Sequence, residues 1–337
     1  MLVVTRSDLD QVFGMGDAFA AVAEAARAWT SGAVVVPPRV ALHAGATGVE
    51  TLVMPGTVEE SFTGAKIWYA AGDEPGLLSS SSAAIFLIDP TLGEVLLDGE
   101  LITDLRTGAM TGLAAQQLAP GNASIAAILG AGIQARTQAL ALVHAIPTLV
   151  EVRISSRNQG RRDAFVAALA AEIESIGSSV TVSSIGSSEE ACRGADIVVA
   201  ATTARSPVID DAWVAETALV CGVGSHDRES AEISPDTVAR SGVVVVDTKP
   251  GAIDGAGDIA RVIAEGRVTR DDVLELGQIL DGVPASHTDR TGPRMLKTVG
   301  FAAADLIAAR AATRLALAGG LGHELPLHGP STTGRTD

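Results

Sequence analysis

The sequence has few aromatic residues and few cysteines. Aromatic side chains make up 3% of the 337 residues, so alanine, valine, leucine and isoleucine must fill the core. The two cysteines, Cys192 and Cys221, lie far apart and lack the CxxC or Cys/His spacing of a structural zinc site. This cysteine content predicts a reduced, cytoplasmic setting, and we expect no metal site.

Positive charge is also scarce. Lys and Arg number 24 against 40 Asp and Glu, which gives a net charge of −16. Such a chain is poorly suited to bind nucleic acid or an anionic membrane surface, and it contains no Lys/Arg cluster with interleaved aromatics. The N-terminus has no basic region followed by a long apolar segment, and no apolar run approaches the roughly 18 residues of a membrane helix. We therefore expect neither a signal peptide nor a membrane span.

A glycine motif is the most informative feature present. The apolar run 125–129 leads into GAGIQA at residues 130–135, the G-x-G-x-x-G/A fingerprint between a predicted strand and a predicted helix. Gly130 would allow the tight turn, Gly132 would let the backbone approach a pyrophosphate, and the helix N-terminus would offer free N–H groups to phosphates. The motif predicts dinucleotide binding, although an ordinary strand–helix turn is the alternative.

Strand and helix patterns alternate from about residue 124 onward. The apolar strand runs cover residues 125–129, 150–154, 180–182, 197–201, 218–223 and 243–247. The helical patterns cover residues 133–144, 161–176, 187–193 and 258–265. Strands that are apolar on both faces belong to a parallel sheet covered by helices. Residues 119–299 are therefore predicted to form a six-stranded Rossmann dinucleotide-binding domain.

The first 118 residues show a different pattern. A helix is expected at 8–30 and another at 103–118, and a last helix at 299–318 would return to this part of the chain. The short strands expected between them cover residues 40–43, 50–54, 65–70, 83–88 and 94–97. Gly and Pro turns between strands favour an antiparallel sheet. The predicted fold class is thus α/β, with a Rossmann NAD(P)-binding domain plus an α+β substrate and dimerisation domain of residues 1–118 with 300–327, followed by a disordered tail at 328–337.

The choice between NAD(H) and NADP(H) depends on the end of the second Rossmann strand. The residues there are Ser155, Ser156, Arg157 and Asn158. NAD-preferring proteins carry an Asp or Glu at this place for the ribose 2′-OH, whereas here Arg157 is followed by Arg161 and Arg162. Because a guanidinium can bind two phosphate oxygens, the sequence favours NADP(H). Arg157 could instead stack over the adenine while Arg161 is solvated, and NAD(H) then stays open.

Two later strand ends should also face the cofactor. Thr202 and Thr203 follow the apolar run 197–201. Val223 lies within CGVGSH at residues 221–226, whose glycines would let the backbone approach the nicotinamide.

Three cationic residues of the N-terminal part are candidates for substrate binding. Arg39 follows two prolines, Lys66 lies inside the apolar strand sequence GAKIW, and Arg106 lies in LITDLRTGA. A basic residue in a strand usually faces solvent. Two guanidinium groups can also anchor a carboxylate by paired hydrogen bonds, and a desolvated lysine among cations can exchange protons near neutral pH.

The ordered motifs resemble those of the ornithine cyclodeaminase/mu-crystallin family. They are PPR, GAK, GLLSSSSAAIFLIDPTLGEVLLDG, LITDLRTGAMTG, ILGAGIQA, ADIVVAATT, VGSHDRESAEI and LKTVGFAAADL. The resemblance covers nearly the whole chain. It implies two domains, usually a homodimer, and an active site in the cleft between the domains, where a nicotinamide cofactor meets a small anionic amino or imino acid.

The same resemblance assigns roles to individual residues. It implies that Arg39, Lys66 and Arg106 hold the substrate carboxylate, with Lys66 near the reacting carbon and nitrogen. It assigns the cofactor to Ser81 or Ser82, Arg106, Thr107, Gly130, Gly132, Ile133, Gln134, Ser155, Arg157, Asn158 and Arg161.

The sequence departs from the family pattern at two places. His226 stands where cyclodeaminases carry an aspartate, with Asp227 one place later, and Leu52 stands where ornithine enzymes carry a glutamate. Lys66, His226 and Asp227 are the candidate catalytic residues, although His226 would also fit a loop histidine without a chemical role. The pattern favours an NAD(P)H-dependent reductase of a small 2-imino carboxylate, or an amino-acid dehydrogenase. The alternatives are an ornithine- or lysine-type cyclodeaminase that uses bound NAD⁺, and a non-catalytic protein that binds NADP(H) and a ligand.

Overall fold

The computed structural model describes residues 1–45, 48–70, 81–225, 227–284 and 291–326, which form two eight-stranded sheets. The strands of sheet A are β1 (Leu2–Val4), β2 (Val34–Val35), β3 (Val40–Ala44), β4 (Val49–Val58), β5 (Phe62–Ala70), β6 (Ser81–Asp89), β7 (Gly93–Asp98) and β16 (His323–Glu324). The strands of sheet B are β8 (Ile125–Leu129), β9 (Glu151–Ser155), β10 (Thr181–Ile185), β11 (Ile197–Ala200), β12 (Leu219–Gly222), β13 (Val243–Val246), β14 (Val273–Glu275) and β15 (Arg294–Lys297). The α-helices are α1 (Arg6–Val12), α2 (Met15–Ser31), α3 (Glu100–Leu118), α4 (Ile133–Ala145), α5 (Gln159–Ser175), α6 (Ser188–Cys192), α7 (Pro235–Arg240), α8 (Lys249–Gly255), α9 (Gly257–Ala264), α10 (Leu276–Leu280) and α11 (Ala302–Ala318).

Sheet B is the predicted Rossmann sheet. Its strands are all parallel, in the order β10-β9-β8-β11-β12-β15-β13-β14, and the strand order reverses between β8 and β11, the point where such sheets bind ligands. The expectation of six strands was wrong, because β14 and β15 join the sheet as well. These strands have 3 and 4 residues and carry charged residues at their ends, so they are too short and too polar for an apolar pattern to reveal them.

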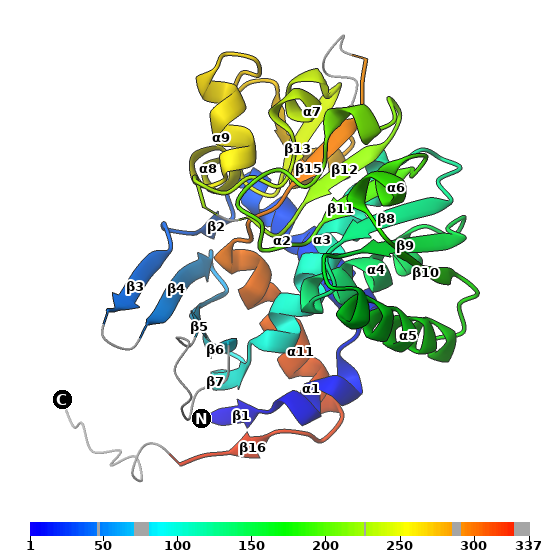
Figure 1. Ribbon diagram of the computed structural model, residues 1–337. Coiled ribbons are helices and arrows are strands. Elements are labelled where there is room, and N and C mark those ends of the chain that lie inside the picture. Colours follow the sequence, from blue (N-terminus) through cyan, green and yellow to red (C-terminus); the bar gives the residue numbers. More distant parts are fainter. Residues whose placement is uncertain (46–47, 71–80, 226, 285–290, 327–337) are drawn as a thin grey trace, which may run out of the picture.

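Sheet A is antiparallel as predicted, apart from β1, which pairs in parallel with β7. The last helix, α11, returns to this sheet and packs across β4 and β5, as expected (Figure 1). Two glycines permit the close approach. A side chain at Gly56 would lie 3.2 Å from Ala302, and one at Gly64 would lie 2.3 Å from the Phe86 carbonyl and 3.1 Å from Leu306.

Two helices begin or break at places that the sequence pattern did not predict. The expected helix at 8–30 is divided into α1 and α2, because Phe13 is extended and buried and Gly14 caps α2 with an extended backbone. The last helix begins at Ala302 rather than 299, because Gly300 has a φ of +77° and Phe301 is extended. Both breaks depend on backbone conformations that hydrophobic periodicity does not report.

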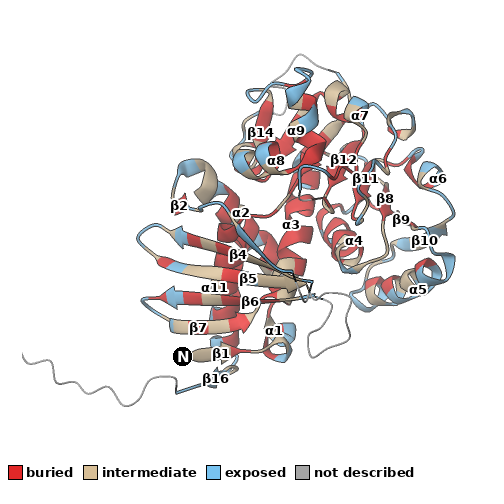
Figure 2. Ribbon diagram, turned by 60° about the vertical axis from the view of Figure 1, so that its left-hand side comes forward, coloured by how far each residue is buried: buried red, intermediate tan, exposed pale blue. Residues whose placement is uncertain are grey.

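Helices α2 and α3 join the two sheets. Helix α3 runs between them and is buried along nearly its whole length (Figures 1 and 2). One cluster of buried apolar side chains includes Ile85 of sheet A, Leu113 of α3 and Ile128 of sheet B, so the core is continuous across the boundary. The predicted boundaries at 118/119 and 299/300 remain predictions. No helix in the described ranges is long and apolar enough to cross a bilayer.

Candidate active site

A cleft of about 1140 Å³ lies where sheet A, α3 and the carboxyl ends of sheet B meet. The predicted site residues that line it are Arg39, Lys66, Arg106, Thr107, Gly130, Gly132, Ile133, Gln134, Ser155, Ser156, Arg157, Asn158, Arg161, Thr202, Thr203 and Val223. The structure therefore brings the three cations of the N-terminal part and the glycine motif into one cavity.

Three of the predicted site residues that the structure describes are not among those lining the cleft. Ser81 and Ser82 lie at the start of β6, paired in register with Ala70 and Tyr69 of β5. The Asp227 carboxylate accepts hydrogen bonds from two backbone N–H groups further along its own loop, so this side chain shapes the loop. His226 lies outside the described residues.

The glycine motif has the geometry that dinucleotide binding needs. Gly130 has a φ of +127°, and a side chain there would lie 2.3 Å from the carbonyl of Ala201, which directly follows β11. Gly132 caps α4 without any side-chain hydrogen bond, and a Cβ built on it meets nothing within 4 Å. The first N–H groups of α4 therefore face open space in the cleft, where a pyrophosphate fits.

Basic and hydroxyl side chains surround the predicted adenosine end of the cleft. Arg157 and Arg161 are exposed, and neither forms an ion pair within the described residues. The Ser156 hydroxyl is buried without a hydrogen-bond partner in that part of the chain. Arg162, by contrast, points inward, where its Nε donates to Ser184 Oγ at 2.8 Å and its Nη1 to the Ser156 carbonyl at 2.9 Å. An unbonded hydroxyl and unpaired guanidinium groups suit a phosphorylated ribose, and Arg162 supports the backbone beneath them.

A further basic residue, Arg205, lines the cleft beyond Thr203. The sequence analysis did not single it out, although its place just after the fourth Rossmann strand was a usable signal.

The side chain of Gln134 in the glycine motif is held by Asp104, an acid that was not predicted as a site residue. Its Nε2 donates to Asp104 Oδ1 at 3.1 Å, across the interface of α3 and α4. Burial raises the pKa of the Asp104 carboxyl to about 6. The signal for this contact was present in LITDLRTGA, but only the packing of α3 on α4 brings the two side chains together.

Lys66 and Arg106 share a buried carboxylate at the end of the cleft that is predicted to hold the substrate, called the substrate end below. Lys66 Nζ lies 2.8 Å from Asp305 Oδ2, and Arg106 Nε donates to Asp305 Oδ1 at 2.9 Å. The three residues are 2%, 6% and 0% exposed, respectively. Thr103 Oγ1 lies 3.4 Å from Lys66 Nζ and accepts a further contact from it. Asp305 comes from α11 and was not predicted, although it lies within the quoted motif LKTVGFAAADL.

Burial governs the protonation of this cluster. It lowers the pKa of Lys66 to about 8, with Arg106 and Arg39 acting in the same direction and Asp305 opposing them. Burial alone would raise the pKa of Asp305, but Arg106 and Lys66 hold it below its usual value. Lys66 can therefore give up or take a proton close to neutral pH while Asp305 stays ionised.

The loop between β15 and α11 shapes the space around Arg106. A side chain at Gly300 would lie 2.7 Å from Arg106 Nη1, so this position must be glycine for the guanidinium to fit. Asp247 fixes the loop, since its Oδ2 accepts from Gly300 N at 2.6 Å and Val299 N at 2.8 Å. Arg39 faces the same cleft from the segment before β3; burial lowers its pKa, and the Asp247 carboxylate opposes that change.

Apolar side chains form the remaining wall of the substrate end. Leu52 lies directly opposite Trp68, and Met54 lies directly opposite Lys66, in the antiparallel pair β4–β5. All four line the cleft, because residues two apart on a strand share a face. Lys66 thus projects beside a wall of leucine, methionine and tryptophan.

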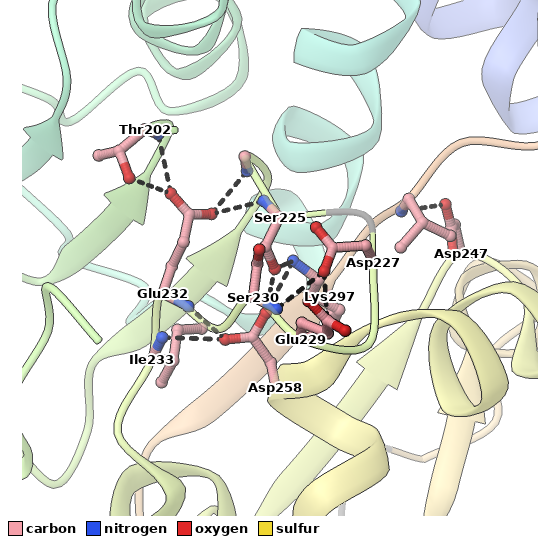
Figure 3. Close-up of polar contacts among 12 residues, drawn as sticks. Thr202, Ser225, Asp227, Glu229, Ser230, Glu232, Ile233, Asp247, Asp258 and Lys297 are labelled. Carbon is pink, nitrogen blue, oxygen red and sulfur yellow. Dashed lines mark hydrogen bonds and ion pairs between the residues drawn. The ribbon is translucent and has the colours of Figure 1, made fainter. Parts of the chain in front are cut away.

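A buried polar network supports the loops that follow β11 and β12 (Figure 3). The Thr202 hydroxyl donates to Glu232 Oε1 at 2.7 Å, so it is used inside the protein. Gly224 was expected to let the backbone approach the nicotinamide. In the structure, a side chain there would lie 2.0 Å from the Thr202 carbonyl and 2.6 Å from Glu232 Oε1, so the glycine permits contact within the protein. Glu232 was not predicted as a site residue, although the motif VGSHDRESAEI contains it.

Comparison with known proteins identifies relatives that cover most of this chain. The family described as the ornithine cyclodeaminase/mu-crystallin family matches residues 1–319. The ketimine reductase mu-crystallin of Mus musculus is 30% identical over 280 residues, which cover 82% of each protein.

Two solved structures share the whole architecture. The Δ1-pyrroline-2-carboxylate reductase of Thermococcus litoralis, in complex with NADH and L-proline, has a TM-score of 0.86 at 30% identity and covers 96% of this chain and 100% of its own. An archaeal alanine dehydrogenase dimer with bound NAD has a TM-score of 0.85 at 25% identity and covers 97% of this chain and 99% of its own.

Proposed function

The chain belongs to the ornithine cyclodeaminase/mu-crystallin family, and from this premise we propose that it is an NAD(P)H-dependent reductase of a small 2-imino carboxylate. The observation that carries the proposal is the single cleft that contains both the glycine motif and the buried group of Lys66, Arg106 and Asp305. A cofactor end alone would fit many dehydrogenases. The buried lysine beside the Arg39 and Arg106 guanidinium groups, which line the same cleft, is what points to an anionic substrate with a basic nitrogen.

Each residue of the substrate end has a proposed role. Arg39 and the Nη1 and Nη2 groups of Arg106 bind the carboxylate, which places the C=N group beside Lys66. A nicotinamide dinucleotide held at the glycine motif would supply the hydride for the C=N carbon. Lys66 Nζ gives its proton to the imine nitrogen, and Asp305 keeps the lysine directed at that place before and after the transfer. The product is the amino acid, and the reverse direction is an amino-acid dehydrogenase reaction.

We infer that NADP(H) is the preferred cofactor. Arg157 and Arg161 are exposed and unpaired in the described residues, the strand end carries no acid, and the Ser156 hydroxyl has no partner there. The two solved structures above contain NADH or NAD, so we infer the preference of this chain from these residues rather than from the fold.

Ornithine-type cyclodeamination is the less favoured alternative. That reaction needs a group to hold a second, side-chain amine, and the wall opposite Lys66 consists of Leu52, Met54 and Trp68. A charged amine against this wall would lose its hydration without a partner. A purely binding role is also less favoured, because a buried lysine with a pKa of about 8 is costly to keep without a chemical use.

The test is to offer a panel of substrates and to measure the consumption of NADPH and of NADH with each one. The substrates are Δ1-pyrroline-2-carboxylate, Δ1-piperideine-2-carboxylate, 2-oxo acids with ammonia or methylamine, and ornithine. We expect turnover with at least one imino carboxylate and loss of that turnover in Lys66→Met. Ammonia release from ornithine without net NADPH consumption, or no turnover with any imine, would contradict the proposal.

We further propose that the protein is a homodimer and works in the cytoplasm. The face of sheet A turned away from α11 exposes Val40, Leu42, Ile67 and Ile88, which are 45–55% exposed. Such an apolar face suits a second copy of the chain. We expect sedimentation velocity to give a dimer for the wild type and a monomer for Ile67→Lys. Cys192 and Cys221 are both free and buried, which suits a reduced compartment.

A further inference from the structure

Glu232 is a fully buried acid that the proposed chemistry does not use. It is 0% exposed, and within the described residues its carboxylate accepts four hydrogen bonds, which come from two loops of the cleft (Figure 3). Oε1 accepts from Thr202 N at 2.8 Å and Thr202 Oγ1 at 2.7 Å, after β11. Oε2 accepts from Gly224 N at 2.6 Å and Ser225 N at 3.0 Å, after β12. One carboxylate therefore joins the ends of two neighbouring strands.

A second buried acid fixes Glu232 itself. Asp258, at the start of α9, accepts from the backbone N–H groups of Glu232 at 2.7 Å and Ile233 at 2.9 Å. It also accepts from Ser225 Oγ at 2.6 Å and pairs with Lys297 Nζ at 3.0 Å, both being 0% exposed at the ion pair. Burial alone would raise the pKa of Asp258, but Lys297 and these hydrogen bonds hold it below the usual value.

The geometry leaves little freedom in the two loops. Gly224 approaches Thr202 so closely that an added Cβ would lie 2.0 Å from the Thr202 carbonyl. Thr202, Val223 and Gly224 all line the cleft, on the side of the glycine motif away from the adenosine end. Burying a carboxylate is costly, and apolar packing would fill the same volume more cheaply. What a carboxylate adds here is four directed acceptor positions.

We propose that Glu232 is a positioning residue that sets the two cleft loops, 201–204 and 223–225, against the reactive half of the dinucleotide. The inference rests on the proposed function, because it assumes that a nicotinamide dinucleotide binds in this cleft. Asp258 and Lys297 hold Glu232 in place from α9 and β15. The adenosine half is bound by other elements and does not depend on this contact.

The test compares Glu232→Gln with Glu229→Gln, the same substitution at an exposed position of the same loop. A glutamine keeps the size of the side chain. Its NH₂ group, however, places hydrogen-bond donors against the donors of one loop, from which the Glu232 carboxylate accepts hydrogen bonds. Three quantities are measured: the fluorescence of bound NADPH, the Kd of adenosine 2′,5′-bisphosphate, and kcat with its primary isotope effect for C4-deuterated NADPH.

In Glu232→Gln we expect the fluorescence change on binding to fall by at least half and kcat to fall roughly 10- to 100-fold, with a larger isotope effect. The Kd of the bisphosphate should change less than twofold, and Glu229→Gln should match the wild type throughout. Unchanged fluorescence and kcat in a folded Glu232→Gln would overturn the inference, and so would an equal loss of bisphosphate binding.

A second variant covers the case in which Glu232→Gln does not fold. Ser225→Ala removes only the hydroxyl between Asp258 and Lys297, so it loosens one loop at the cost of a single small group. The same fluorescence loss, at smaller amplitude, supports the inference, and wild-type fluorescence overturns it. Bound-NADPH fluorescence does not need turnover. A wild type that binds NADPH but reduces no imine would therefore overturn the proposed function while still testing Glu232.

Discussion

The two ends of the cleft differ in the burial and ion pairing of their basic side chains. At the substrate end, Lys66 and Arg106 are buried and already paired with Asp305. At the adenosine end, Arg157 and Arg161 are exposed and have no ion pair within the described residues. A paired and buried cation keeps its position without a ligand, whereas an exposed one gains its partner only when a ligand binds. The contrast suggests a substrate end built for chemistry and an adenosine end built for affinity.

The largest effect is expected from Lys66→Met, which removes the proposed proton donor. We expect kcat to fall at least about 10³-fold, from the lost acid and the lost charge beside the substrate. The melting temperature should also fall, because Asp305 keeps Arg106 but loses its closer partner. Steady-state kinetics and thermal unfolding measure the two effects. If the variant keeps more than a tenth of the wild-type kcat, Lys66 is not the acid.

Arg157→Asp tests the adenosine end. Loss of a charge-assisted contact to a 2′-phosphate costs about 2–3 kcal/mol, so the ratio of kcat/KM for NADPH over NADH should fall roughly 30- to 150-fold. Arg314→Asp, at an exposed position on α11, serves as the control for the same charge change. A wild type that prefers NADH, with a ratio that Arg157→Asp leaves unchanged, would contradict the assignment.

The pH profile tests how Asp305 supports Lys66. The proposed reduction needs protonated Lys66, whose pKa is lowered to about 8, so kcat/KM should decline above about pH 8. Asp305 raises that pKa, so Asp305→Asn should move the decline to lower pH. At a pH above both declines, each unit of this shift lowers the rate about tenfold. Asp89→Asn breaks a different ion pair, with Arg310, and should leave the profile in place. If kcat/KM declines at the same pH in Asp305→Asn as in the wild type, Asp305 does not control the protonation of Lys66 in the reaction.

The last prediction concerns stability rather than activity, at Asp104, which accepts a hydrogen bond from Gln134 of the glycine motif. Its pKa is about 6 in the folded protein and near 3.8 in the unfolded chain. The unfolded chain thus ionises first, and Asp104 destabilises the fold fully above pH 6 but hardly below pH 4. Asp104→Asn keeps an acceptor for Gln134, so it should raise the free energy of unfolding by about 2–3 kcal/mol at pH 7.5 and by little at pH 4. Denaturant titration at the two pH values measures this, and a loss of stability at pH 7.5 would refute it.

The sequence predicted the parts of this molecule that depend on neighbouring residues. The strand, turn and helix around Gly130 follow from a local pattern, and so do the three cations with their short motifs. Asp305 could not be inferred as the partner of Arg106, because the two residues are 199 positions apart and only the return of α11 joins them. Gly224 shows the same limit. Its glycine was recognised, but the neighbour that requires it, Glu232, is set by the packing of β11, β12 and α9.

The position of α11 also orders the events of biosynthesis. Lys66 and Arg106 leave the ribosome well before Asp305, and every strand of sheet B is made in between. A nascent chain can fold units in the order in which they emerge, so sheet B can form while the two cations still lack their carboxylate. The proposed reactive centre is thus completed by α11, the last helix in the described part of the chain. A chain that stops before α11 would carry an intact glycine motif and remain catalytically silent.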